Sequence, residues 1–203
     1  MTRLSILITA GPTREAIDPV RFISNRSTGA MGKAIAKAAR KKGHRVILIG
    51  PGENLSALNM RKKVLKNFTA ADAVVMAAAV ADYRPQRQSA RKIKKSAAKM
   101  VLKLIKNPDI LSEIGHKKEN RVIVGFALET ENLYKNAAEK LKKKNLDFIV
   151  ANQLTKKHNV FGRNKTSVLI IDKAGSRKLL KNVSKDKVAE EIIKKIEEIR
   201  SKN

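Results

Sequence analysis

Short apolar runs alternate with longer amphipathic segments along most of the chain, and this alternation is the feature that most constrains the fold. The apolar runs are rich in Val, Ile and Ala and are often followed by Gly or Pro, which is typical of buried strands. We expect strands over residues 4–10, 45–50, 73–80, 121–129, 148–152 and 167–172. The amphipathic segments predict helices over residues 33–43, 56–68, 109–117, 132–144 and 184–201.

This order of elements predicts an α/β fold with a Rossmann-like, doubly wound, mostly parallel sheet and flanking helices. Right-handed crossovers place the carboxyl ends of the parallel strands at one edge of such a sheet, where ligands bind. Residues 83–100 are polar, basic and poorly patterned, so we interpret them as a basic flap. The sequence has no repeats, linker or low-complexity block, and we expect a single domain over residues 1–203.

The composition excludes several classes of function. The sequence contains no cysteine, so it offers neither a disulfide framework nor a thiolate nucleophile. Its three histidines are scattered and lack the spacing of metal ligands. No apolar run reaches the roughly 18 residues of a membrane span, and the apolar N-terminal run has no signal-peptide cleavage site. We therefore expect a cytoplasmic protein without a membrane partner.

The formal net charge of +27 has two interpretations. A basic surface can bind the phosphates of nucleic acid, or it can be a lysine-rich solvated exterior that attracts small anionic metabolites. The lysines fall mostly on expected helices, as in residues 140–144 and 185–195. Aromatic residues, which stack on bases, make up only 3% of the sequence. These observations favour the solvated exterior, and we do not expect nucleic acid as a partner.

The segment after the first expected strand is dense in polar residues and ends in the run Ser27, Thr28 and Gly29. Such a run at the start of a helix presents backbone N–H groups and hydroxyls that suit a phosphate. The simpler alternative is that Ser27 or Thr28 only caps the helix. A loop of this length usually has a function, although Asp18 and Arg21 can simply pair with each other.

A second polar group follows the third expected strand. Small residues such as Ala78 and Ala79 let a ligand lie against the backbone. Asp82 is suited to accept from a ribose hydroxyl or to hold a metal ion through water. Residues 92–95, KIKK, would neutralise a polyphosphate, although a solvated charge run is the default interpretation of that motif taken alone.

Taken in order along the chain, these motifs resemble those of the phosphopantothenate–cysteine ligases. The matching blocks are TAGPTREAIDPVRFISNRSTGAMG, AAAVADYRP, KIKK, LIKNPDIL, VGFALET and KLKKKNLDFIVAN. They extend from Leu7 to Asn152, and a looser match covers residues 160–192. The resemblance therefore extends over nearly the whole chain.

The resemblance implies a ligase that joins 4'-phosphopantothenate and L-cysteine in coenzyme A biosynthesis. CTP would activate the carboxylate as an acyl-cytidylate, with Mg²⁺ carried by the nucleotide and water rather than held directly by protein ligands. The family also implies a homodimer with the active site near the subunit interface. Two alternatives stay open, namely an ATP-dependent version of the same ligase and a basic nucleic-acid-binding module. The bacterial-style KIKK and NPDIL blocks favour CTP.

The same resemblance assigns residues to the expected site. The nucleotide would contact Asp82, Lys92, Pro108, Asp109, Ile110, Leu111, Phe126, Lys140 and Lys144. From the residue types themselves, as described above, we expect the phosphate-bearing substrate to contact Ser27, Thr28, Gly29, Ala78 and Ala79. Two residues would be catalytic, with Asn25 holding the acyl-cytidylate and Lys92 offsetting charge on the phosphates. On spacing alone, Phe126 is more often a core residue and Lys140 an exposed helix lysine.

The chain departs from the family pattern in two respects. Between Leu55 and Ser56 the family usually carries a longer segment with one further strand, so we expect a shortened connection and an incomplete sheet edge. In many bacteria this ligase is fused to a flavin-dependent decarboxylase. The motifs of that half are absent, and we do not assign its activity to these residues.

Overall fold

The structure is a computed structural model that describes residues 2–50, 53–95, 98–153 and 165–202. Its strands are β1 (Ser5–Thr9), β2 (Arg14–Ala16), β3 (Phe22–Ser24), β4 (Arg45–Ile49), β5 (Ala73–Met76), β6 (Tyr83–Pro85), β7 (Leu104–Lys106), β8 (Val122–Glu129), β9 (Phe148–Gln153), β10 (Lys165–Asp172) and β11 (Arg177–Ser184). Its helices are α1 (Ala30–Lys41), α2 (Ala57–Phe68), α3 (Ile110–His116), α4 (Leu133–Lys143) and α5 (Lys185–Arg200).

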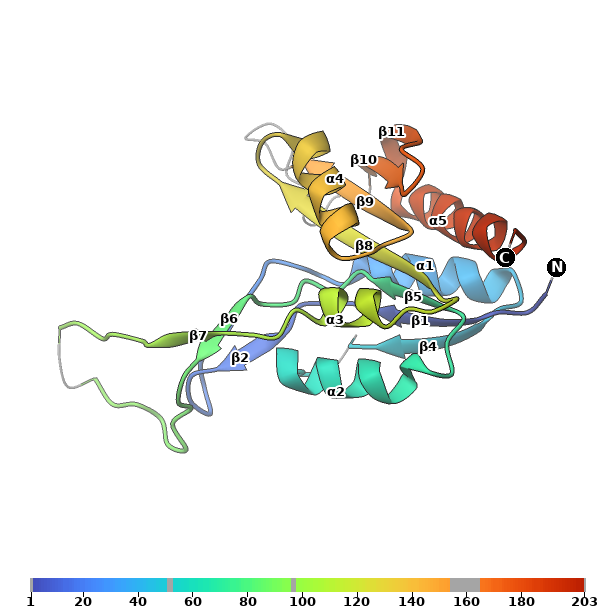
Figure 1. The fold of residues 1–203 in the computed structure, drawn as a ribbon. Coiled ribbons are helices and arrows are strands. Elements are labelled where there is room, and N and C mark those ends of the chain that lie inside the picture. Colours follow the sequence, from blue (N-terminus) through green and yellow to red (C-terminus); the bar gives the residue numbers. More distant parts are fainter. Residues whose placement is uncertain (1, 51–52, 96–97, 154–164, 203) are drawn as a thin grey trace.

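Seven strands form one central sheet in the order β11-β10-β9-β8-β5-β1-β4 (Figure 1). The five strands from β9 to β4 run parallel, while β10 and β11 pair antiparallel. The chain leaves β1 towards β4 on one side and then crosses back to β5 on the other. The carboxyl ends of β1 and β5 therefore flank a topological switch point, where doubly wound sheets bind ligands.

Helices cover both faces of the sheet (Figure 1). On one face α1 and α5 pack on the strands, and Ile35 and Ile192 are fully buried in that half of the core. On the other face α2, α3 and α4 bury residues such as Met60 and Ile114. These side chains recur at helical spacing along each amphipathic segment, so removal of apolar surface from water drives both layers together. The Rossmann-like, mostly parallel sheet expected from the sequence is confirmed.

Several element boundaries differ from those expected. The strand expected over residues 73–80 ends at Met76, because residues 77–82 turn away to bridge the loop after β1; Pro12 and Ala79 form an isolated bridge there. The first helix begins at Ala30 instead of residue 33. β11 and the four three-residue strands were not expected. β4 lies at the edge of the sheet. The single domain over residues 1–203 stays a prediction.

Residues 83–95 and 98–106 form an arm that projects beyond the carboxyl edge of the sheet (Figure 1). Its base is the antiparallel pair of β6 and β7, in which Tyr83 lies opposite Lys106. The expected basic excursion thus extends to the end of β7. Its movement as a flap stays a prediction.

Candidate functional site

Hydrogen bonds join the loop after β1 to the loop after β5. The Thr13 amide donates to the Ala79 carbonyl at 3.2 Å, and the Ala79 amide donates to the Gly11 carbonyl at 3.0 Å. The Asn25 side-chain amide donates to the Val80 carbonyl at 3.0 Å. Small residues in the second loop allow these backbones to approach closely. As a result, Asn25 is held beside the end of β5 at the switch point.

Two adjoining cavities lie at this edge of the sheet. The larger cavity, about 570 Å³, extends from the loop before α1 past the loop after β5 and the strands β8 and β9 to β10 and the start of α5. The smaller cavity, about 240 Å³, lies between the loop after β5, the start of α3 and the end of α4. Four residues line both cavities: Ala78, Val80, Asp82 and Phe126. The two cavities are therefore neighbouring parts of one site.

The larger cavity gathers all the residues expected around the phosphate-bearing substrate, together with one of the two expected catalytic residues. These residues are Asn25, Ser27, Thr28, Gly29, Ala78 and Ala79. The N-cap position of α1 is Gly29, at a φ of 71°. The Thr28 hydroxyl accepts from the first helical amide, at Ala30, at 3.4 Å, and the Ser27 hydroxyl accepts from the Gly29 amide at 3.3 Å, so both hydroxyls do contribute to capping. A Cβ atom on Gly29 would lie 2.9 Å from the Gly11 nitrogen, so a larger residue would push the two loops apart. Gly29 itself offers no side-chain cap and the first turn of α1 has no acidic residue, so this helix N-terminus is suited to an anion.

The smaller cavity gathers all but one of the residues expected around the nucleotide. These residues are Asp82, Pro108, Asp109, Ile110, Leu111, Phe126, Lys140 and Lys144. The two lysines come from the last turn and the C-cap of α4, so both face the segment that begins α3. Phe126 projects from β8 between the two cavities, and it also packs against the core.

Each of the two lysines is already paired with a carboxylate. The Lys140 ammonium lies 2.6 Å from Glu129, and the Lys144 ammonium lies 2.9 Å from Asp109. Burial raises the pKa of each carboxyl, but hydrogen bonds from its lysine and one other donor outweigh burial and leave both pKa values below their ordinary range. Both carboxyls are therefore ionised near neutral pH. The smaller cavity consequently has little excess positive charge in the absence of a ligand.

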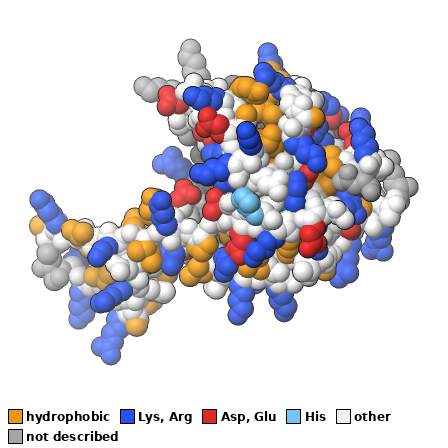
Figure 2. Space-filling view, in the orientation of Figure 1, with side chains coloured by type: hydrophobic (Ala, Val, Ile, Leu, Met, Phe, Trp, Pro, Cys, Tyr) orange, Lys and Arg blue, Asp and Glu red, His pale blue; other side chains and the backbone are white. Residues whose placement is uncertain are grey.

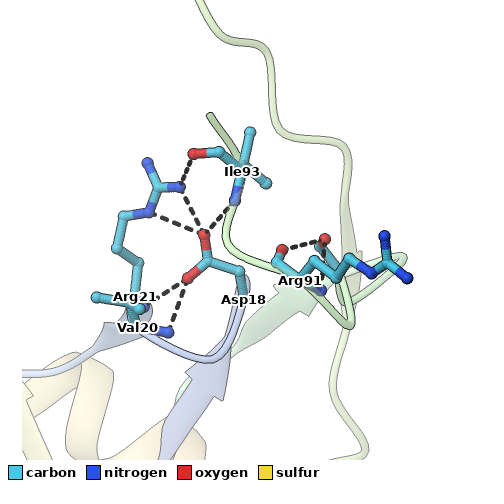
Figure 3. Close-up of polar contacts among 6 residues, drawn as sticks. Asp18, Val20, Arg21, Arg91 and Ile93 are labelled. Carbon is cyan, nitrogen blue, oxygen red and sulfur yellow. Dashed lines mark hydrogen bonds and ion pairs between the residues drawn. The ribbon is translucent and has the colours of Figure 1, made fainter. Parts of the chain in front are cut away.

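Lys92 is the expected site residue that lines neither cavity in the described structure. It lies on the arm, next to Ile93, which is hydrogen-bonded to Asp18 and Arg21 (Figure 3). The pairing of Asp18 with Arg21 is confirmed, with 2.5 Å between the Arg21 Nη2 and Asp18 Oδ2 atoms. The backbone of the KIKK run is therefore hydrogen-bonded at Ile93 to the loop after β1.

Five further polar residues that line the cavities carry no role in the sequence-based assignment, and one of them is Arg26 in the larger cavity. Asn152, Thr166 and Lys185 line the far end of the larger cavity, and the Asn152 amide donates to the Thr166 hydroxyl at 2.8 Å. Asn107 lines the smaller cavity and donates to the Ala81 carbonyl at 2.8 Å. Asn107 and Asn152 belong to the LIKNPDIL and FIVAN motifs, and membership of these motifs is the sequence feature that could have identified them as site residues. Thr166 and Lys185 lie within the looser match over residues 160–192, which assigned no role to either residue.

Comparison with known proteins identifies the family. The model of the DNA/pantothenate metabolism flavoprotein C-terminal domain matches residues 1–199. The chain belongs to this family. In that domain family, the coenzyme A biosynthesis bifunctional protein CoaBC of Bacillus subtilis is 44% identical over 204 residues, which is 94% of this chain and 50% of that protein. The Borreliella burgdorferi protein of the same name is 45% identical, over 93% of this chain and 51% of its own length.

A solved structure supports the same membership for this domain. The crystal structure of the C-terminal domain of a coenzyme A biosynthesis bifunctional protein CoaBC superposes with a TM-score of 0.81 at 37% identity. That match covers 98% of this chain and 97% of the solved one. The chain spans about half the length of the curated relatives it matches.

Within the described part of the chain, no helix is long and apolar enough to cross a membrane. The described residues also contain no group of three or more His, Cys, Asp or Glu side chains arranged to hold a metal ion.

Proposed function

We propose that the domain joins 4'-phosphopantothenate to L-cysteine through an acyl-cytidylate, with consumption of CTP and release of pyrophosphate and CMP. The observation that carries this proposal is the pair of adjoining cavities. The residues expected for the acyl substrate line the larger one, and those expected for the nucleotide line the smaller one. Asp82 and Phe126, which line both, mark the zone where the two substrates would react. The first step, in which two phosphate-bearing substrates react with each other, needs such a junction.

In the first step, a carboxylate oxygen of 4'-phosphopantothenate attacks the α-phosphorus of CTP and the bond to pyrophosphate breaks. The N-terminus of α1 would orient the acyl substrate through its phosphate. Residues 108–111 would contact the cytosine edge, while Phe126 offers an apolar face to the base. Lys140 and Lys144 would bind the triphosphate, and the nucleotide must compete with Glu129 and Asp109 for them.

Because both lysines already face carboxylates, the charge developing on the phosphates needs further cations. Mg²⁺ supplies this charge neutralisation when it is bound with the nucleotide. Asp82 is the carboxylate common to both cavities, so it fits a Mg²⁺ ion held through water. The second cation is Lys92, which must reach the phosphates from an arm.

In the second step, the amine of cysteine attacks the acyl carbon, the bond to CMP breaks and the amine loses a proton. Asn25 lines the larger cavity beside the residues shared with the smaller one. A neutral amide can donate a hydrogen bond to the acyl-cytidylate without competing as a nucleophile. We therefore assign to Asn25 the role of holding the intermediate while cysteine enters.

The proposal is tested by measuring pyrophosphate from the purified protein with 4'-phosphopantothenate, cysteine and either CTP or ATP. We expect release that requires 4'-phosphopantothenate and is faster with CTP. Pyrophosphate release in the assay with ATP but not in the assay with CTP would show that the ATP-dependent alternative is correct. No release with either nucleotide would exclude the ligase. Salt-dependent binding to any DNA duplex, without pyrophosphate release, would support the nucleic-acid alternative.

Replacement of Lys144 by glutamine is expected to raise the KM for CTP by roughly tenfold with little change in kcat, since one charge-assisted hydrogen bond is lost. Lys142→Gln is the matched control, because Lys142 is exposed on the same helix and does not line the cavity. Steady-state kinetics of both variants measure the effect. Equal KM values in the two variants would contradict the assignment of Lys144.

We further propose that the domain forms a homodimer through the β2–β3 hairpin and the base of the arm. Four large apolar side chains are exposed there: Val20 at 60%, Phe22 at 48%, Tyr83 at 46% and Leu104 at 42%. Exposed hydrophobic side chains are visible among Lys and Arg on the arm (Figure 2). Apolar patches of this kind mark protein interfaces, and twofold pairing is the commonest arrangement of identical chains.

Light scattering is expected to give the mass of a dimer for the unmodified chain. Leu104→Asp should raise the dimer dissociation constant by roughly thirtyfold, the effect of losing one interface hot spot. Leu179→Asp is the control, because Leu179 is equally apolar and 54% exposed but lies on β11. A monomeric unmodified chain, or equal weakening by the two variants, would contradict this interface.

A further inference from the structure

The carboxylate of Asp18 connects the loop after β1 to the arm (Figure 3). Its Oδ1 atom accepts hydrogen bonds from the backbone amides of Val20 at 2.8 Å and Arg21 at 2.9 Å. Its Oδ2 atom accepts from the backbone amide of Ile93 at 3.1 Å. The guanidinium of Arg21 donates to the same Oδ2 atom and also to the Ile93 carbonyl, at 2.8 Å. We call Asp18, Arg21 and the Ile93 backbone the latch.

The latch is built around a buried charge. The side chain of Asp18 is 0% exposed, whereas that of Arg21 is 39% exposed. Hydrogen bonds from the Arg21 guanidinium, followed by those from the backbone amides, hold the pKa of Asp18 well below its usual range. The carboxylate is therefore charged at any pH at which an enzyme of this kind is assayed. A buried carboxylate with this many donors fixes the groups that it binds.

The arrangement extends beyond what the turn itself requires. The amides of Val20 and Arg21 would be enough for a carboxylate that only shaped the loop. Asp18 also binds the backbone amide of Ile93, which lies 75 residues further along the chain in the middle of the KIKK run. The neighbouring bond from the Ser89 amide to the Ile17 carbonyl, at 2.9 Å, fastens the same part of the arm.

The loop that carries the latch is itself tied to the body of the domain. The buried carboxylate of Glu15 accepts a hydrogen bond from the first amide of α2, at Ala57, with a distance of 2.8 Å. The loop is thus joined to the body at one end, and Asp18 joins it to the arm. Lys92, one residue before Ile93, is consequently set at a defined position relative to the sheet.

We propose that Asp18 is a positioning residue for Lys92, which it holds in place through Arg21 and the backbone of Ile93. The proposal rests on the function assigned to Lys92 above. The segment 91–95 is otherwise exposed, apart from the partly buried Ile93. Without the latch, Lys92 would sample many positions, and a misplaced catalytic group loses much of its effect.

The first test is hydrogen exchange at the Ile93 amide, which does not depend on any activity. In Asp18→Asn, one acceptor oxygen is lost and an amide group faces Arg21, so we expect Ile93 exchange to accelerate by at least about tenfold. Glu15→Gln is the matched control, since its buried carboxylate lies in the adjoining strand β2 and accepts a hydrogen bond from Ala57 of α2 instead of from the arm. Unchanged Ile93 exchange in Asp18→Asn, or equal acceleration in both variants, would overturn the latch.

The second test is a double-mutant cycle on pyrophosphate release with 4'-phosphopantothenate and CTP. We expect Asp18→Asn to lower kcat by roughly tenfold to a hundredfold, and to have no further effect once Lys92 is glutamine. Effects that multiply in the double variant would overturn the positioning role. An inactive unmodified chain would instead refute the proposed function, whereas the exchange result would still stand.

Ile93→Pro provides an independent variant that leaves the Asp18–Arg21 pair intact. Proline removes the N–H group that Asp18 binds, and it also fixes φ at residue 93 and restricts the backbone of Lys92 before it. We expect it to lower kcat to the same extent as Asp18→Asn. A wild-type kcat in Ile93→Pro would contradict the proposal even if Asp18→Asn failed to fold.

Discussion

Asn25→Asp is expected to leave acyl-cytidylate formation largely intact while slowing the transfer to cysteine by roughly a hundredfold to a thousandfold, the usual effect of removing one donor to a reacting oxyanion. The substitution preserves the shape of the side chain. It removes the amide that donates to the Val80 carbonyl and places a negative charge in the larger cavity. Pyrophosphate should then appear as a burst of about one equivalent per site, while the intermediate accumulates.

Quenched reactions analysed by mass spectrometry would separate acyl-cytidylate from product. Ser24→Ala serves as the control, because the Ser24 hydroxyl binds the Thr13 carbonyl in the same loop and does not line either cavity. This control should show neither a burst nor an accumulated intermediate. If Asn25→Asp lost pyrophosphate formation together with product, the residue would not be specific to the second step.

The fold follows from periodicity where burial is regular. β1, β8 and β9 are almost continuously buried, and their apolar runs stand out in the sequence. β11 is mostly exposed at the edge of the sheet, so no apolar pattern marks it. The three-residue strands are too short for any period to be recognised. Long buried elements were therefore predictable, and edge or very short ones were not.

The site was predictable in its residue types but only partly in its geometry. Motif resemblance identified Asp82, Phe126 and the lysines of α4, which the cavities bring together. It gave no indication that Glu129 and Asp109 neutralise those lysines, because such pairs depend on distances between separate elements. Sequence spacing also could not indicate where Lys92 lies. Its position depends on contacts between the arm and the loop after β1.

Lys92→Gln is expected to reduce pyrophosphate release by roughly a hundredfold, since a cation that offsets charge in the transition state is lost. Glutamine keeps much of the length and polarity of the side chain, so a general loosening of the arm is not the expected cause. Lys99→Gln is the matched control on the same basic arm, because Lys99 is also exposed and lies outside the KIKK run. Wild-type rates of pyrophosphate release in Lys92→Gln would contradict its role.

The latch holds Lys92 on the arm, and Lys92 does not line the cavities of its own chain. We therefore expect the lysine to act on the site of the partner in the proposed dimer. In a mixed dimer of Lys92→Gln and Asn25→Asp chains, one site would then combine an intact Asn25 with an intact Lys92. In an equal mixture of the two variant chains, half of the dimers are mixed, and each mixed dimer has one complete site out of two. The mixture should therefore recover about one quarter of the rate at which the unmodified chain forms product. If Lys92 serves its own chain, no dimer in the mixture contains a complete site and activity stays at the level of the separate variants.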